Sequence, residues 1–224
     1  MSIYFHHFHK CAGTSIVKSL NSTTNGFYEP NLNGNPVNKG KTLSLHDMSD
    51  ESLEILCKNI SLKKKCFAYE WGIPNLNIIK KYNKLVVVIR EPVERLVSNY
   101  KYDLKIKATK STFSSYISNI AIPYCRTDYY NYEISRRLNN YNSVNKIKDN
   151  AEWLYNEFDE IIILEKGKFR KIKNKNIVNL DLIPFTNKSK SIFSIIKKKQ
   201  KIIINNEDFK EDLLFYSYLK NRDK

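Results

Sequence analysis

The sequence predicts an α/β fold in which helices flank a central, mainly parallel sheet, and two observations support this prediction. The clearest strand, residues 85–89, is an unbroken run of leucine, valine and isoleucine, which is typical of parallel strands covered on both faces. Strand-like and helical patterns alternate along the rest of the chain, as they do in layered α/β folds. Because 224 residues without an internal repeat suffice for one sizeable core, we expect a single domain over residues 1–224.

The first predicted strand covers residues 2–9, where isoleucine, tyrosine and phenylalanine favour β structure. A turn of small residues follows, and then a helix that we expect Thr14 and Ser15 to cap through their hydroxyl groups. Residues 21–41 are rich in glycine and asparagine, which predicts a long loop of the kind that often forms a lid or a substrate wall.

Two strands in the middle of the chain end in charged residues. A helix is predicted over residues 50–59, and a strand over residues 66–71 places Glu70 near the carboxyl end of that strand. The strand 85–89 ends at Arg90, and the proline two residues later suits the first turn of a helix.

The helix after Arg90 is amphipathic. Its apolar face is formed by residues at helical spacing, namely Val93, Leu96, Val97, Tyr100 and Leu104. This spacing places Arg95, Ser98 and Tyr102 together on a different face. Beyond it, the predicted elements are helices over 113–120, 127–138, 144–156 and 206–219 and strands over 158–165 and 177–182.

The composition limits the possible functions. The net charge of +15 indicates an anionic ligand or a polyanionic partner, or neither, because an A/T-rich coding sequence would also enrich lysine. The four cysteines show no CxxC spacing, so neither a disulfide framework nor a metal site is predicted. Because we find no signal-like or membrane-spanning run, we expect a soluble, cytoplasmic protein.

The segment that follows the first strand has the features of an anion site. It contains a cation, Lys10, then the small residues Cys11, Ala12 and Gly13, and then the hydroxyls of Thr14 and Ser15. A phosphate at a strand-to-helix turn needs small residues so that backbone N–H groups can approach it, and a cation that neutralises its charge. The segment is not a Walker A motif, because the lysine precedes the glycine.

A second candidate site follows the strand 85–89. Arg90 is a multi-donor cation at the carboxyl end of a sheet strand, where α/β folds bind ligands. Ser98 lies off the apolar face of the helix that follows.

Together these two segments resemble the PAPS-dependent sulfotransferases, in particular the carbohydrate branch that includes heparan sulfate 2-O-sulfotransferases. The first family motif reads His-x-Pro-Lys, followed by small residues and Thr-Ser, and residues 7–15 are similar to it. His9 stands in place of the proline, and Cys11 stands where threonine is common. The second motif has the form Arg-x-Pro-x-x-Arg-x-x-Ser-x-Tyr, and residues 90–100 fill every position.

The resemblance implies a P-loop-like three-layer fold and transfer of a sulfuryl group from 3′-phosphoadenosine 5′-phosphosulfate (PAPS) to an acceptor hydroxyl, on an oligosaccharide or polysaccharide. It implies that residues 10–15 bind the 5′ end of PAPS, with Lys10 stabilising the leaving group, and that Arg90 and Ser98 bind the 3′-phosphate. Lys188 is expected to close over the nucleotide or to meet an anionic acceptor. No metal ion is implied.

The acceptor must lose a proton, which requires a general base. The family places a glutamate or histidine in the corresponding region, and Glu70 is our candidate because its aromatic neighbours would raise its pKa. His46 is the alternative base. The other histidines, His6, His7 and His9, are expected to pack or to contact the donor, and the tyrosines between 124 and 132 are expected to stack on sugar rings or to join the core.

Two other classes of protein are considered. A P-loop kinase that uses ATP and magnesium would share the architecture, but the Walker lysine is missing and Arg90 stands where an aspartate would bind magnesium. The charge alone would suit a nucleic-acid-binding module, but no helix-turn-helix, zinc or RNP-type motif accompanies it. We therefore expect no nucleic-acid partner.

Overall fold

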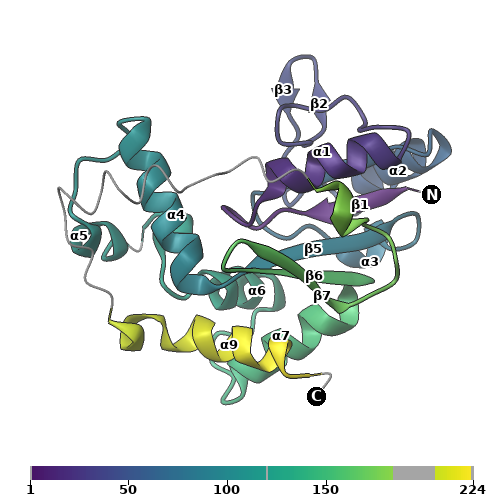
Figure 1. Ribbon diagram of the computed structural model, residues 1–224. Helices are drawn as coiled ribbons and strands as arrows, with labels where there is room; N and C mark the ends of the chain where they lie inside the picture. The colour runs from purple at the N-terminus through teal and green to yellow at the C-terminus, as the bar shows by residue number, and fades with distance from the viewer. Residues whose placement is uncertain (1, 120, 184–204, 223–224) are drawn as a thin grey trace.

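A five-stranded sheet runs through the centre of the computed structural model, which describes residues 2–119, 121–183 and 205–222 (Figure 1). The strands lie in the order β4 (Cys66–Tyr69), β1 (Ile3–His6), β5 (Lys84–Arg90), β6 (Glu160–Glu165) and β7 (Lys168–Lys173). Neighbouring pairs are parallel from β4 to β6, and β7 is antiparallel to β6. The predicted α/β fold with a mainly parallel sheet is confirmed.

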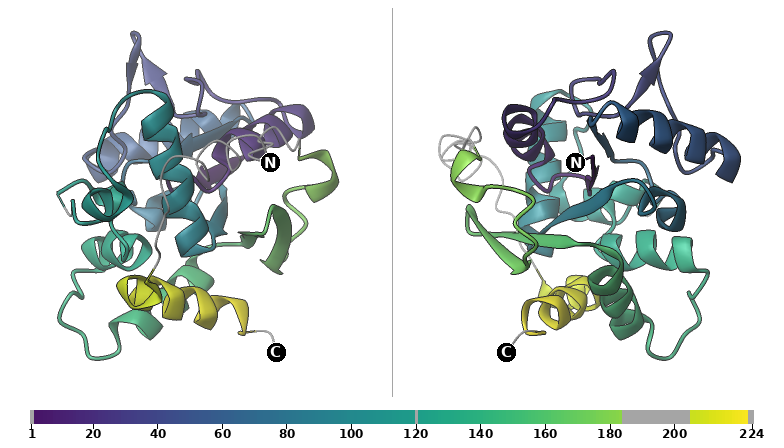
Figure 2. Two further views of the ribbon diagram at one scale, coloured as in Figure 1. Left: turned by 60° about the vertical axis from the view of Figure 1, so that its left-hand side comes forward. Right: turned by 90° about the vertical axis from the view of Figure 1, so that its right-hand side faces the viewer.

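Helices cover both faces of this sheet. Figures 1 and 2 show α1 on one side and α6, α7 and α9 on the other, which gives three layers. The helices are α1 (Gly13–Thr23), α2 (Asp50–Leu62), α3 (Leu76–Ile79), α4 (Pro92–Lys105), α5 (Phe113–Ile117), α6 (Tyr129–Leu138), α7 (Lys146–Glu157) and α9 (Lys210–Lys220). The short elements are the hairpin β2 (Val37–Asn38) and β3 (Lys41–Thr42) and the 3-10 turns Pro123–Cys125, Leu180–Leu182 and Asn206–Phe209.

The order of the strands in space differs from their order in the chain. After β1 the chain forms β4 on one side of β1, and it then crosses back to form β5 on the other side. The register pairs His6 with Val87, so the carboxyl ends of β1 and β5 lie next to each other. Parallel α/β sheets bind ligands at such a switch point, outside the carboxyl ends of the strands.

Burial explains why β5 was the clearest strand in the sequence. Each residue from 85 to 89 is fully buried between the helical layers, so both faces of the strand need apolar side chains. A second, smaller apolar cluster joins α4 to α5 and to the C-terminal segment through Leu96, Tyr100, Phe113, Tyr116, Cys125 and Phe209.

Several predicted elements need correction. The first strand ends at His6 rather than residue 9, because the chain turns there into a loop. Residues 177–182 are not a strand, since the N–H groups of Ile177 and Val178 donate to the Glu160 carboxylate, each at 2.9 Å. The last strand of the sheet is instead β7, which was not predicted because its sequence, Lys-Phe-Arg-Lys-Ile-Lys, is rich in charged residues. Lysines are common on edge strands because they discourage pairing with other chains.

Within the described ranges, no helix combines the length and the apolar character needed to cross a membrane. The same ranges contain no group of three or more histidine, cysteine, aspartate or glutamate side chains arranged to hold a metal ion.

Candidate active site

The loop after β1 turns into α1 through two residues with left-handed backbone. Lys10 and Ala12 both have φ of 62°, although neither is glycine. Ala12 is the N-cap of α1 and makes no side-chain cap, so the prediction that Thr14 and Ser15 cap this helix is wrong. They lie within its first turn instead, where the Ser15 N–H donates to the Ala12 carbonyl at 3.0 Å and the N–H groups at the very start of the helix can face an anion.

Gly13 is required at the start of α1 because the imidazole of His7 lies directly against it. A Cβ atom on Gly13 would lie 1.9 Å from Nε2 of His7, which no side chain could tolerate. His7 is buried, and burial lowers its pKa to about 3, so the ring is neutral at pH 7.

The Lys10 ammonium lies over the ring of Tyr102 on α4, with Nζ 3.9 Å from the ring centre. Partial burial lowers the pKa of Lys10, and the charge of Asp103 opposes that shift. Tyr102 is 46% exposed, so this contact lies at the edge of the site rather than in the core. Sequence analysis gave Tyr102 no role; its place one turn after Ser98 was the available signal.

Arg90 and Ser98 both come from the junction of β5 with α4. Glu91 caps α4, and its two carboxylate oxygens accept from the N–H groups of Val93 at 3.2 Å and Glu94 at 2.7 Å. The Nε atom of Arg90 lies 3.5 Å from the Glu94 carboxylate, and Ser98 is half-buried on α4.

Arg95 does not share the environment of its predicted neighbours on α4. It is fully buried and donates to the carbonyls of Tyr124 at 3.0 Å and Arg126 at 2.8 Å. Its guanidinium also lies over the ring of Tyr129, 4.4 Å from the ring centre. Arg95 therefore fixes the segment that leads into α6, while Tyr102 is exposed.

Glu70 follows the last residue of β4, as predicted, and is only 8% exposed, so it is not a surface glutamate. Its Oε1 accepts from the Asn33 amide at 2.8 Å, and its Oε2 lies 3.3 Å from His7 Nδ1, in poor alignment for a hydrogen bond. Burial raises the pKa of Glu70, while the amides of Asn33 and Asn35 and the charge of Lys10 lower it.

Asn33 and His7 were missed as members of this group. Asn33 comes from residues 21–41, the segment predicted to be a long loop, and its side chain contacts Glu70. Nothing in the loop's sequence singles out one of its asparagines. His7 could have been found from register, because its N–H donates to Tyr69 O and so continues the β1–β4 pairing to Glu70.

His46 lies in a different environment from Glu70. Its Nδ1 forms a hydrogen bond with the Tyr69 hydroxyl, and its Nε2 lies 3.5 Å from the Asp47 carboxylate. Partial burial lowers the pKa of His46. The polar contacts of His46 are thus with Ser44, Asp47 and Tyr69, and none of them is shared with Glu70.

The remaining histidines and tyrosines mostly pack. The ring of His9 stacks on Tyr124 at 4.8 Å, and the His9 N–H donates to the Tyr129 hydroxyl at 3.2 Å. Burial lowers the pKa of His9 to about 4. Tyr129 and Tyr130 are core residues. Lys188, its neighbours Asn187 and Ser189, and residues 197–199 lie outside the described residues.

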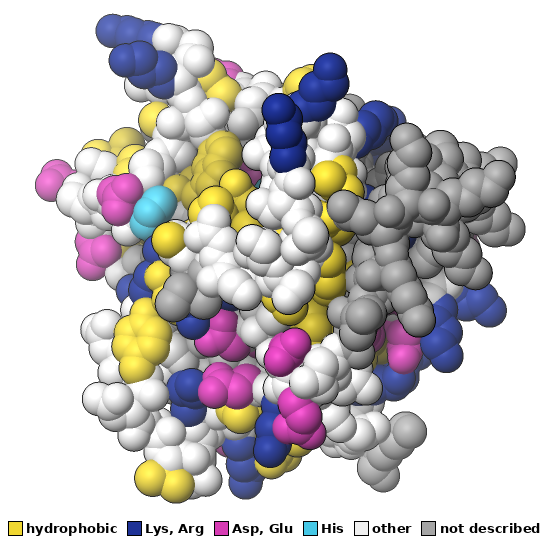
Figure 3. Space-filling view, turned by 90° about the vertical axis from the view of Figure 1, so that its left-hand side faces the viewer, with side chains coloured by type: hydrophobic (Ala, Val, Ile, Leu, Met, Phe, Trp, Pro, Cys, Tyr) yellow, Lys and Arg dark blue, Asp and Glu magenta, His cyan; other side chains and the backbone are white. Residues whose placement is uncertain are grey.

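The charge on the face that bears α4 is mixed. Figure 3 shows this face with Asp and Glu side chains near its centre as well as Lys and Arg side chains. Over the described part of this face, the surplus of 15 positive charges does not form a single basic patch.

Comparison with protein families gives one match, to the sulfotransferase family, over residues 1–213. No curated protein and no solved structure is significantly similar to the chain. The matched range contains both segments predicted to bind anions, and Glu70.

Proposed function

The chain belongs to the sulfotransferase family, and from this premise we propose that it transfers the sulfuryl group of PAPS to a hydroxyl group of a carbohydrate acceptor. One observation carries the proposal: the Lys10 loop and Arg90 follow two strands that are neighbours at the switch point of the sheet. Two cationic segments there suit a donor with phosphate groups at both ends. We treat residues 1–224 as one catalytic domain.

In this proposal the two segments divide the donor between them. The first turn of α1, with Cys11, Ala12, Gly13, Thr14 and Ser15, receives the 5′ end through backbone N–H groups and hydroxyls. Arg90 and Ser98 bind the 3′-phosphate. Because Glu94 lies at Nε of Arg90, the terminal nitrogens of the guanidinium remain for a bidentate contact with phosphate. Lys188 remains a proposed contact with the nucleotide.

The reaction requires one bond to form as another breaks. The acceptor oxygen attacks sulfur, and the bond between sulfur and the bridging oxygen of PAPS breaks to release adenosine 3′,5′-bisphosphate. Negative charge develops on that bridging oxygen, where the Lys10 ammonium stabilises it. The acceptor proton passes to a base, and no step in this scheme is assigned to a metal ion.

Glu70 is the proposed base. It lies at the carboxyl end of β4, next to β1, and burial raises its pKa toward the range useful for accepting a proton at neutral pH. The Asn33 amide holds the Glu70 carboxylate in place, and the neutral His7 ring lies beside it. The alternative, His46, bonds to Tyr69 and Asp47 instead.

Calorimetry with adenosine 3′,5′-bisphosphate, with and without magnesium, tests the donor. We expect binding that does not depend on magnesium, and transfer of label from PAPS to members of an oligosaccharide library. Binding of ATP only with magnesium would instead support a kinase, and absence of binding would reject PAPS as the donor.

Glu70→Gln tests the base. Losing a general base should lower kcat by about 100-fold to 10,000-fold with the donor affinity retained. His46→Gln is the control, and we expect it to leave kcat nearly unchanged. Near-normal kcat in Glu70→Gln would reject the assignment, and a large loss in His46→Gln would transfer the role to His46.

A further inference from the structure

The hydroxyl of Tyr130 lies between the two proposed donor-binding segments. Tyr130 is fully buried on α6, and its Oη donates to the Arg90 carbonyl at 2.8 Å. The same oxygen accepts from the Arg90 N–H at 3.1 Å and lies 3.1 Å from Cys11 Sγ. The one hydroxyl proton is used on Arg90, so the Cys11 thiol acts as the donor in the third contact; the same thiol also lies 3.7 Å from the His9 carbonyl.

Arg90 needs this hydroxyl because β1 ends before β5 does. The last β1–β5 pair is His6 with Val87, whereas β5 continues to Arg90. On the β6 side the ladder continues, and the Glu91 N–H donates to Leu164 O at 3.2 Å. On the β1 side the chain has left the sheet to form the anion-binding loop, so Tyr130 supplies both hydrogen bonds that a neighbouring strand would have made.

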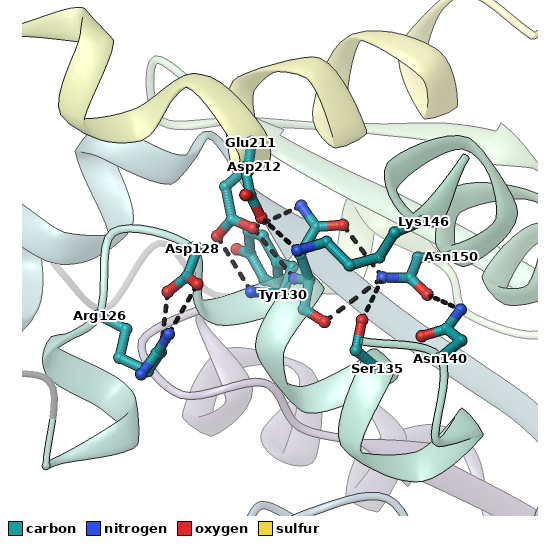
Figure 4. Close-up of polar contacts among 10 residues, drawn as sticks. Arg126, Asp128, Tyr130, Ser135, Asn140, Lys146, Asn150, Glu211 and Asp212 are labelled. Atoms are coloured by element: carbon teal, nitrogen blue, oxygen red, sulfur yellow. Dashed lines mark hydrogen bonds and ion pairs between the residues drawn. The ribbon is translucent and has the colours of Figure 1, made fainter. Parts of the chain in front are cut away.

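Tyr130 is held firmly enough to act as a fixed point. The Asp212 carboxylate on α9 accepts from the N–H groups of Tyr130 and Asn131, each at 3.0 Å, at the start of α6 (Figure 4). The Tyr130 ring packs against Phe8 and Phe215, at 5.2 Å and 5.7 Å between ring centres. Its backbone, ring and hydroxyl therefore all have defined partners.

We infer that Tyr130 is a positioning residue that sets Arg90 relative to the Lys10 loop, and so fixes the spacing at which the enzyme reads the two phosphate ends of its donor. The inference rests on the proposed function, because it takes Arg90 as the ligand of the 3′-phosphate. Tyr130 itself touches no reacting atom. It acts through the Arg90 backbone and the Cys11 thiol.

The test is Tyr130→Phe, which removes a single oxygen. The readout is the ratio of the affinities for adenosine 3′,5′-bisphosphate and adenosine 5′-monophosphate, measured by calorimetry on the full chain. Loss of hydrogen bonds that orient Arg90 should reduce this ratio about fivefold to tenfold. A general loss of stability would weaken both ligands alike and leave the ratio unchanged.

Tyr216→Phe is the matched control. Tyr216 is also buried, and its hydroxyl has no hydrogen-bond partner among the described residues, so the ratio should stay at the wild-type value. If Tyr130→Phe does not fold, Cys11→Ala replaces it. That variant keeps the Tyr130–Arg90 bonds but cuts the link to the loop, and it should lower the ratio about twofold to threefold.

The outcomes separate the two claims. A wild-type protein that does not bind adenosine 3′,5′-bisphosphate overturns the proposed function and this inference with it. If the wild type prefers adenosine 3′,5′-bisphosphate to adenosine 5′-monophosphate and Tyr130→Phe keeps the same affinity ratio, the inference alone is overturned. The same holds for Cys11→Ala where that variant is used.

Discussion

The two segments that we propose to bind the donor, residues 7–15 and residues 90–98, follow the carboxyl ends of neighbouring strands but are stabilised in different ways. In residues 90–98 the start of the helix is built locally, because β5 runs straight into α4 and Glu91 caps the helix, whereas the Arg90 backbone is held from a distance, by Tyr130. Residues 7–15 depend on distant contacts. Two non-glycine residues there hold left-handed backbone, and Tyr130 contacts Cys11 from 119 residues away.

Two segments proposed to bind the same donor are thus held in place by different means, one mainly by local and the other mainly by long-range interactions. A left-handed non-glycine residue costs about 1–2 kcal/mol, so Lys10 and Ala12 adopt that backbone only because the surrounding fold compensates. A capped helix start needs no such compensation.

Acid should destabilise the protein chiefly through the three histidines at and just after the end of β1. Burial lowers the pKa of His6 and His7 to about 3 and that of His9 to about 4. Below about pH 6.5 the unfolded chain binds protons that the folded one does not, so stability falls by up to about 1.4 kcal/mol per pH unit for each histidine. Burial raises the pKa of Asp212 to about 7. Just below pH 7 the folded protein therefore binds a proton at Asp212 that the unfolded chain does not, and this partly offsets the loss of stability.

Urea unfolding between pH 7 and pH 5 measures this effect. His6→Asn removes one of the three groups and should reduce the histidine contribution to the pH slope by about a third. A stability that stays flat over this range would show that these histidines are not buried in neutral form.

Lys10→Ala should have the next largest effect. Removing one preorganised charge from the leaving oxygen should lower kcat about 100-fold to 1,000-fold. Steady-state rates with labelled PAPS measure kcat, and calorimetry measures donor affinity, which we expect to fall less. Lys18→Ala, on the outer part of α1, is the control and should retain wild-type kcat. A Lys10→Ala enzyme with normal kcat would exclude the leaving-group role.

Arg90→Ala should weaken ligands that carry a 3′-phosphate about 10-fold to 100-fold, as expected for loss of a charge-assisted contact. Adenosine 5′-monophosphate, which lacks that phosphate, should bind the variant and the wild type alike. An equal loss for both ligands, measured by calorimetry, would mean that Arg90 does not read the 3′ end.

Glu91→Ala should have the smallest effect, a loss of about 1 kcal/mol of stability from the uncapped start of α4. Ser49→Ala removes a cap from α2, away from the sheet's switch point, and should cost a similar amount. Chemical denaturation compares the two. Because α4 carries Ser98, we expect Glu91→Ala to weaken donor binding and Ser49→Ala to leave it unchanged. If the two variants bind the donor equally well, the cap of α4 does not affect donor binding.

Elements fixed by local interactions were predicted correctly, and those that depend on long-range contacts were not. β5, α4 and the position of Glu70 at the end of β4 were correct because each has a local signal: an apolar run, a proline with helical spacing, or a turn after the strand. The predicted cap of α1 was wrong: Thr14 and Ser15 are good local caps, yet the helix begins earlier, with Ala12 as its N-cap two residues before Thr14. β7 was missed because its lysines mask its alternation.

Local sequence signals thus predicted the layering of sheet and helices, and they singled out the two segments that we propose to bind the donor. Only the tertiary structure decided that these segments meet. Strand β4 lies between β1 and β5 in the chain but not in the sheet, and parallel neighbours are chosen by burial of whole faces rather than by local propensity. The contacts of Asn33 with Glu70 and of Tyr130 with Arg90 were likewise decided by the tertiary structure, because side-chain contacts across such distances leave no mark in a single sequence.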